Sequence, residues 1–135
     1  MFSGCEDMFH SGICNNLDAS PLTLNDTIEI KIGEQYCNPE EELLLVCDSL
    51  VADSRCPIGV VCVWEGNAEV SFILGEGDHE HSAFHLNTHN SFRTDTIIQG
   101  YRYQLIDVLP YPEYGIERKQ DEYSILMIVS KDNTP

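Results

Sequence analysis

The sequence predicts an all-β fold, an antiparallel β-sandwich or barrel of about six to seven strands that carries disulfides. Short stretches with alternating apolar and polar residues recur along the chain, which is the period of half-buried strands. Gly, Pro, Asn and Asp separate these stretches, and no window keeps a helical period over three turns. The connections are too short for the crossovers that parallel strands need, so we expect antiparallel pairing.

The first half of the chain predicts a leader followed by two strands. Residues 1–26 have no sustained period and contain many turn-forming residues, so we interpret them as a loop-like leader or tether. A single all-β domain then fills residues 27–135. Strict alternation predicts a half-buried strand over residues 27–33, and the apolar run at 43–47 predicts a more deeply buried one. The polar residues 37–42 between them predict a turn.

The second half predicts four more extended segments. Apolar residues fall on one face of a long stretch that begins near Val60, and Gly66 marks a bend or bulge within it. A Gly-rich hairpin turn and a returning strand follow, then a polar connection up to about Gly100. The expected segments are residues 60–74, 83–86, 101–109 and 122–131, with a Pro-rich loop over 112–122.

Length and charge limit the class of protein. A chain of 135 residues fits one domain of ordinary size. The formal charge of −16, with only seven Lys and Arg residues, argues against nucleic acid and against electrostatic docking to anionic lipid. No apolar run approaches the roughly 20 residues of a membrane-spanning helix.

Six cysteines in a small acidic chain are typical of an oxidising compartment. Cys56 and Cys62 bracket a segment with Pro57 and Gly59 near its start, so the chain can bend and bring the two sulfurs together. We therefore predict a Cys56–Cys62 disulfide. A structural zinc site normally needs Cys-x2-4-Cys pairs, and the chain has none.

The other four cysteines allow three pairings, which the sequence does not decide. We favour Cys37 with Cys47, because both flank one polar turn. Two interpretations stay open for Cys5. The small residues before it, Ser3 and Gly4, match the end of a bacterial lipoprotein signal, which makes Cys5 a candidate for lipid attachment. In the other interpretation Cys5 pairs with Cys14.

One pair of motifs resembles a known family. The segment Asp53-Ser54-Arg55-Cys56-Pro57 is followed by Cys62-x-Trp64-x-Gly66-Asn67-Ala68. This combination resembles an uncharacterised family of small bacterial secreted proteins and lipoproteins, and the resemblance spans residues of about 28 to 130. It implies a secreted, periplasmic or outer-membrane-anchored all-β domain. The family has no established activity, so the resemblance supplies no catalytic residues. The cysteines at positions 5, 14, 37 and 47 are not part of the family pattern.

A group of histidines is the first candidate site. His79, His81 and His85 have even spacing, so a strand would place them on one face, and Asp78 and Glu80 lie beside them. Imidazoles with nearby carboxylates suit zinc, copper or nickel, so a divalent metal is the one cofactor that the sequence suggests. The alternative is a solvated hairpin without a ligand.

Arg55 and two tyrosines are the second set of candidates. A basic residue on a loop closed by a disulfide is a way to present the anchor of a protease inhibitor. In the alternative, Arg55 pairs with Asp53 and fixes the loop. Tyr111 and Tyr114, in the Pro-rich loop, are the aromatic pair that we expect to be exposed for binding. We expect Trp64 to pack over the Cys56–Cys62 bridge.

The functional prediction is a non-enzymatic, secreted or lipid-anchored domain of the bacterial envelope that binds an unknown protein or small ligand. The chain has no G-x-S-x-G, no H-E-x-x-H and no phosphate-binding glycine loop. The alternatives are a divalent-metal-binding domain that uses the histidine hairpin and a protease inhibitor that presents Arg55.

Overall fold

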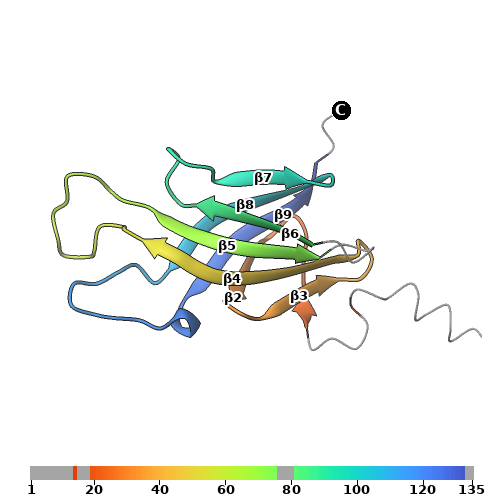
Figure 1. Ribbon diagram of the computed structural model, residues 1–135, viewed down its shortest axis with the longest axis horizontal. Helices are drawn as coiled ribbons and strands as arrows, with labels where there is room; N and C mark the ends of the chain where they lie inside the picture. Colours follow the sequence, from red (N-terminus) through yellow and green to blue (C-terminus); the bar gives the residue numbers. More distant parts are fainter. Residues whose placement is uncertain (1–13, 15–18, 76–80, 133–135) are drawn as a thin grey trace, which may run out of the picture.

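The computed structural model describes residues 14, 19–75 and 81–132, and they form two β-sheets (Figure 1). Apart from one 3-10 turn, η1 (Gln120–Glu122), the regular structure in this part of the chain is extended. The strands are β1 (Ser20–Pro21), β2 (Thr27–Lys31), β3 (Gln35–Asn38), β4 (Leu43–Asp53), β5 (Ala68–Gly75), β6 (His81–Asn87), β7 (Asp95–Ile98), β8 (Tyr101–Leu109) and β9 (Ser124–Lys131). No described helix has the length and apolar character that a membrane crossing requires.

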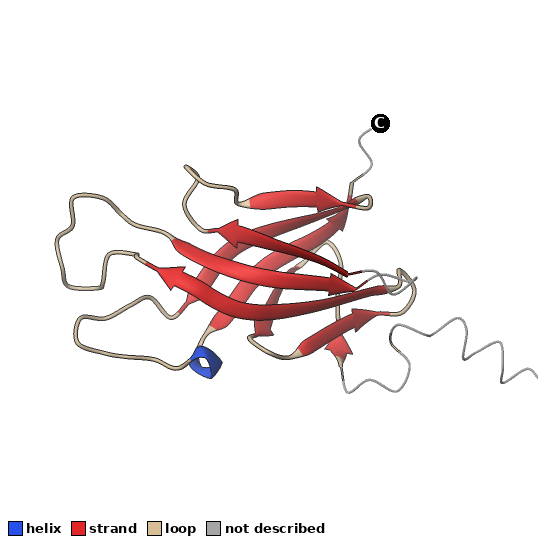
Figure 2. Ribbon diagram, in the orientation of Figure 1, coloured by secondary structure: helices blue, strands red, loops and turns tan. Residues whose placement is uncertain are grey.

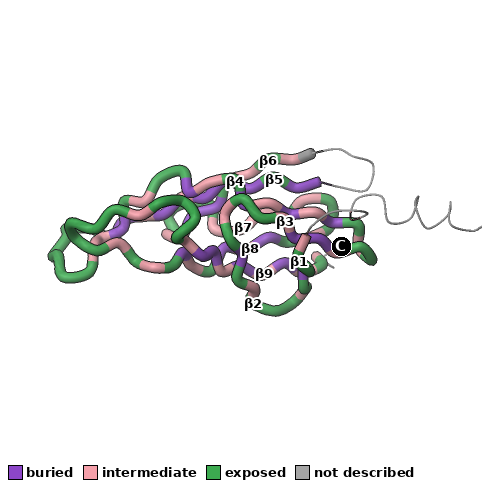
Figure 3. Tube along the Cα trace, turned by 90° about the horizontal axis from the view of Figure 1, so that it is seen from below, coloured by how far each residue is buried: buried purple, intermediate pink, exposed green. Residues whose placement is uncertain are grey.

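The two sheets make a sandwich. One sheet has the strand order β1-β3-β4-β5-β6 and the other has β2-β9-β8-β7. Figure 3 shows them as two layers. Every pairing between named strands is antiparallel except that of β1 with β3. The all-β prediction is therefore confirmed, and of the two architectures it allowed, the structure has the sandwich and not the closed barrel.

Residues from both sheets fill the core. Alternate residues of β5 are fully buried, as the pattern of that segment predicts, and they include Val70, Phe72 and Leu74. Phe84 of β6 stacks on Phe72, with 5.2 Å between ring centroids, and also contacts Tyr103 of β8 at 5.3 Å. This aromatic series joins the two layers, and burial of such side chains is the main favourable contribution to folding.

Two features of the strand prediction are wrong. The expected long strand from Val60 begins only at Ala68, because residues 60–67 belong to a loop that a disulfide and Gly66 shape. The structure also has more strands than expected. The additional ones, β1, β3 and β7, are four residues long or shorter. β3 overlaps the start of the expected turn at 37–42, and β7 lies within the expected polar connection. So few residues do not establish a detectable period.

Residues 20–22 belong to the sandwich, although the sequence predicts its boundary at residue 27. Ser20 and Pro21 pair in parallel with β3, and Leu22 is buried in the core. A disulfide from Cys14 to Cys37 connects this segment to the sheet.

Both expected pairings among the remaining cysteines are wrong. Cys37 and Cys14 are bonded to each other, so neither Cys37–Cys47 nor Cys5–Cys14 forms. In the β3–β4 register Cys37 lies opposite Leu44, which separates it from Cys47 along the strand. Cys47 is a free cysteine in the core, and burial raises the pKa of its thiol to about 12. Cys5, the candidate for lipid attachment, lies outside the described residues.

Candidate functional site

Three loops meet at one end of the sandwich. Residues 54–67 connect β4 to β5, residues 110–123 connect β8 to β9, and residues 88–94 connect β6 to β7. The first two are the long loops at the left of Figure 2. Residues of the two motifs that resemble a known family lie in the first loop or directly beside it, which makes this end the candidate site.

Arg55 holds the base of these loops together. Its side chain is 3% exposed, and its Nε and Nη2 each donate a 2.8 Å hydrogen bond to the Asp53 carboxylate. The other donors reach the end of β8, with Nη1 donating to the Val108 carbonyl at 2.5 Å and Nη2 to the Pro110 carbonyl at 3.2 Å. This bidentate geometry is the strong form of an Arg–carboxylate contact. Arg55 therefore links the two sheets at this end.

The burial of Arg55 conflicts with the role that the protease-inhibitor hypothesis gives to this residue. Burial by itself lowers the pKa of the guanidinium, but hydrogen bonds and charge attraction from Asp53 outweigh it, and the pKa is raised. The side chain is charged, enclosed and paired. A protease inhibitor must present its anchor to the enzyme, so Arg55 is not the presented residue that the hypothesis required. The structural alternative, pairing with Asp53, is what the structure contains.

Tyr111 and Tyr114 are both exposed, as the sequence predicts, but only Tyr111 packs on Arg55. Tyr111 covers Arg55, with the guanidinium carbon 4.4 Å from the ring centroid, and 43% of its surface is exposed. Such a cation–π contact adds to the stability of the Arg55 cluster. Tyr114 is 83% exposed and projects from the β8–β9 loop.

The tip of the β4–β5 loop is fixed in place. The predicted Cys56–Cys62 disulfide closes it. At its neck, the Ser54 amide donates to the Asn67 carbonyl at 2.7 Å and the Cys56 amide donates to the Glu65 carbonyl at 3.1 Å. The Ile58 amide also donates to the carbonyl of Pro112 at 2.9 Å, which connects this loop to the β8–β9 loop. The two loops therefore form one surface.

Gly66 and Asn67 explain part of the second motif. Gly66 has φ +81°, and a Cβ at this position would lie 2.0 Å from the Ser54 carbonyl oxygen, so only glycine fits here. The Asn67 amide group bridges to the next loop, donating to Asn87 Oδ1 at 2.9 Å and accepting from the His89 amide at 3.0 Å. Both residues hold the loops in position.

Trp64 packs against two rings of the β6–β7 loop. Its ring centroid lies 5.0 Å from that of His89 and 6.5 Å from that of Phe92. The expected packing of Trp64 over the Cys56–Cys62 bridge stays a prediction. The Ser91 amide donates to His89 Nδ1 at 3.0 Å, so Nε2 carries a hydrogen and faces Glu65 Oε1 at 2.9 Å. These two contacts orient the His89 imidazole against the Trp64 indole, with the two ring planes tilted by 53°. His89 is therefore part of an aromatic cluster at the loop end.

Exposed apolar side chains concentrate on these loops. Among the described residues, fourteen large hydrophobic side chains are exposed, and nine of them lie in the three loops. We call these nine the loop face: Ile58, Val60, Val61, Val63, Trp64, Phe92, Tyr111, Tyr114 and Ile116. Figure 3 colours much of the trace at the loop end, at its left, as exposed. A concentration of this kind marks an interaction site more often than chance surface composition.

A pocket of about 310 Å³ lies beside the loop face. Its lining includes Arg55, Glu65, His89, Asp107 and Tyr111. The guanidinium donors are already directed at Asp53 and two carbonyls, and the imidazole nitrogens contact Glu65 and Ser91. These polar groups are engaged in holding the loops, so the pocket presents few free groups for chemistry.

The histidine hairpin lies at the other end of β6. His79 is outside the described residues, as is the side chain of His81. His85 is exposed, and its Nδ1 lies 2.7 Å from Glu69 Oε2. Within the described part of the chain, no group of three or more His, Cys, Asp or Glu side chains is arranged to hold a metal. The described residues therefore add no metal ligand to the three histidines that the metal-binding hypothesis uses.

The loop face was missed by sequence reasoning although a signal was present. The sequence pattern predicts that part of the apolar segment from Ile58 to Trp64 is a buried strand, because alternation does not distinguish a core face from an exposed loop.

Comparisons of the chain with protein-family models, with curated proteins and with solved structures find no match. The fold and the site define a disulfide-bearing β-sandwich with an apolar loop end.

Proposed function

We propose that this protein is a non-enzymatic domain of the bacterial envelope, secreted or lipid-anchored, that binds its partner through the loop face. The observation that carries the proposal is the concentration of nine of fourteen exposed large hydrophobic side chains in three adjacent loops. Folding does not require these side chains to be apolar, because they remain in water. Two disulfides among the described cysteines support an oxidising compartment.

The rigidity of the loops supports a binding role. A loop that is ordered before binding loses less conformational entropy when a partner arrives. Here the Arg55 cluster, the Cys56–Cys62 disulfide and the Ile58–Pro112 hydrogen bond already fix the two long loops. The enclosed Arg55–Asp53 pair acts in this arrangement as scaffold and not as a catalytic group.

Site-specific photocrosslinking in bacterial cells that export the chain tests the proposal. A benzophenone side chain at position 61 samples the loop face, and the same group at position 97 samples an exposed apolar position on β7. We expect adducts, of protein or of lipid, from position 61 and few from position 97. Equal adduct yields from the two positions, or none from position 61, would contradict the proposal.

A further inference from the structure

We propose that the partner of the loop face is the surface of a zwitterionic lipid bilayer, into whose interfacial layer the loop tips insert. This inference rests on the proposed function and names the partner of the same face. Insertion of loop tips is distinct from crossing the membrane, and it requires apolar groups that project and a local charge that the surface does not repel.

The first argument is the shape of the loop face. Val61 and Val63, on either side of Cys62, are fully exposed, so they contact almost nothing in the molecule. Tyr114 and Ile116 project from the neighbouring loop, at 83% and 54% exposure. A protein partner needs a matched pocket for each such projection, because protein interfaces pack as densely as protein interiors. A fluid bilayer accepts separate projections without matched pockets.

The second argument is the order of side chains along the β4–β5 loop. Its aliphatic residues Val60, Val61 and Val63 occupy the middle, farthest along the chain from both strands. Trp64 follows them and packs back on His89 and Phe92, with 47% of its surface exposed. Aliphatic groups at the tip and an amphipathic aromatic behind them match the order of hydrocarbon and headgroup layers in a bilayer.

The third argument is the distribution of charge. The three loops, residues 54–67, 88–94 and 110–123, hold four of the seven Lys and Arg residues but only five of the 23 Asp and Glu residues. Their net charge is −1 in a chain of −16. Any anionic lipid in a membrane repels the acidic remainder of the molecule, so the nearly neutral loop end is the part that meets the least repulsion there.

The charge also selects the type of lipid. The loop end carries no basic cluster of the size that attracts anionic lipid, and Arg55 is enclosed and paired with Asp53. Insertion is therefore driven by the apolar side chains, and the chain as a whole is repelled by negative surface charge. We expect binding to phosphatidylcholine vesicles, with weaker binding when anionic phosphatidylglycerol is added.

Sedimentation with extruded phosphatidylcholine vesicles tests the inference on the full chain. We expect V61D/V63D to lower the partition coefficient about tenfold or more, because two aspartates replace two inserted aliphatic groups. V61N/V63N, which adds no charge, should show most of this loss. I73D/I97D makes the same chemical change at two exposed strand positions and should bind like the native chain. Circular dichroism of each variant establishes that it is folded.

Two further results decide the interpretation. Binding to phosphatidylcholine should change little from about 0.1 to about 0.5 M NaCl, because it is not electrostatic. Absence of vesicle binding by the native chain, or equal binding by V61D/V63D and I73D/I97D, overturns the inference. If photocrosslinks from position 61 then reach a protein, the proposed function stands and only the lipid partner is wrong. If position 61 gives no adduct of either kind, the proposed function fails as well.

Discussion

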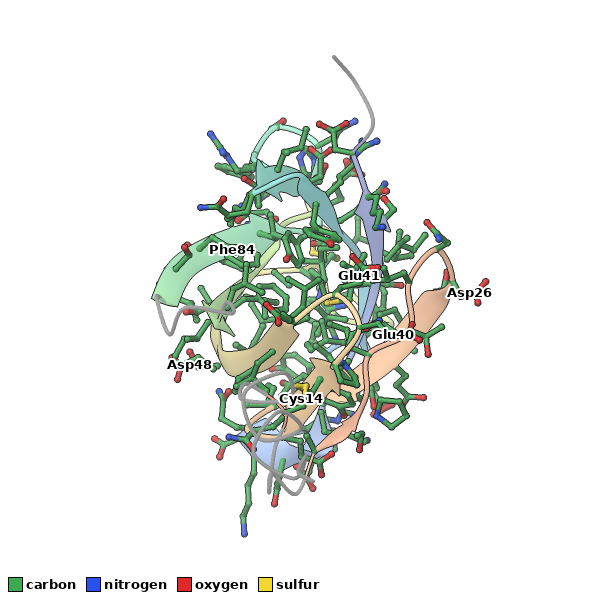
Figure 4. All side chains as sticks on the ribbon, turned by 90° about the vertical axis from the view of Figure 1, so that its right-hand side faces the viewer. Cys14, Asp26, Glu40, Glu41, Asp48 and Phe84 are labelled. Carbon is green, nitrogen blue, oxygen red and sulfur yellow. A yellow bond between two sulfur atoms is a disulfide. The ribbon has the colours of Figure 1, made fainter. Side chains whose placement is uncertain are left out.

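The two ends of the sandwich expose different kinds of side chain to solvent. At the loop end, large apolar side chains are exposed in number, and an enclosed Arg55–Asp53 pair holds the bases of the loops together. At the other end, which faces the viewer in Figure 4, the turn after β3 carries Glu40 and Glu41. There the Tyr101 hydroxyl donates to Glu41 Oε1, and Lys131 Nζ lies 3.2 Å from Glu41 Oε2.

This contrast indicates which features serve folding and which serve function. An acidic, solvated turn with ion pairs at its edge keeps one end of the molecule in water. The loop end differs because it encloses one ion pair at its base and exposes many large apolar groups, an arrangement that folding alone does not favour. The difference assigns the contact role to the loop end and can be tested by changing matched residues at each end.

The largest effect should come from Arg55→Ala. Loss of the guanidinium leaves the Asp53 carboxylate, 12% exposed, without its partner, and the Val108 and Pro110 carbonyls lose their donors. We expect the free energy of unfolding in urea to fall by about 3–5 kcal/mol. Arg102→Ala removes the exposed Arg102–Asp95 pair and should cost about 0–1 kcal/mol. Similar losses in the two variants would mean that Arg55 does not hold the loop end.

A glycine pair tests the close approach at the neck of the β4–β5 loop. Gly66 and Gly115 both have φ +81°, but an added Cβ meets the Ser54 carbonyl only at Gly66. Gly115→Ala should cost about 1 kcal/mol from backbone strain. Gly66→Ala should cost about 2–4 kcal/mol because the clash adds to the strain. Urea unfolding measures both, and equal values would show that the neck has room for a side chain.

Removing the two disulfides one at a time shows which of them contributes more to the free energy of unfolding and which contributes more to vesicle binding. Cys14–Cys37 closes a separation of 23 residues and Cys56–Cys62 one of 6, so loop-closure entropy predicts losses of about 3 and about 2 kcal/mol for the paired Cys→Ser variants. Vesicle binding should follow the opposite order. C56S/C62S should bind more weakly because its loop is no longer ordered in advance, and C14S/C37S should bind like the native chain. Equal binding by both variants would remove the role of the loop disulfide.

The smallest effect should be the alkaline pH dependence at the acidic end. Burial, together with the hydrogen bond to Glu41 and its charge, raises the pKa of Tyr101 from 10.0 to about 12. Between these values the unfolded chain loses the phenol proton while the folded chain keeps it, so stability should fall as the pH rises. Tyr101→Phe should show a shallower fall in urea titrations at pH 9 and pH 11. The remaining slope should include Cys47, whose thiol pKa is also raised. An identical slope in Tyr101→Phe and the native chain would exclude Tyr101 as a source.

The fold class followed from the sequence because long strands carry a readable period. Residues 101–109 were predicted with the bounds that β8 has. Short strands such as β7 lack enough residues for a period. The Cys14–Cys37 bond joins residues 23 positions apart, and local sequence does not encode such a pairing.

The candidate site was only partly predictable. The pairing of Arg55 with Asp53 was one of two open interpretations, and Tyr111 and Tyr114 were expected to be exposed. The loop face was not foreseen, because exposure of the residues from Ile58 to Trp64 depends on where β5 begins.

The central claim is that the loop end contacts the bilayer, and Trp64 reports on it directly because it is the single tryptophan of the chain. Its emission should be recorded with phosphatidylcholine vesicles, with and without lipids brominated in the acyl chains. We predict a blue shift and quenching by the brominated lipids for the native chain and for I73D/I97D, and neither for V61D/V63D. Vesicle-bound protein whose Trp64 emission is unshifted and unquenched would contradict the account, because the molecule would then bind through another surface.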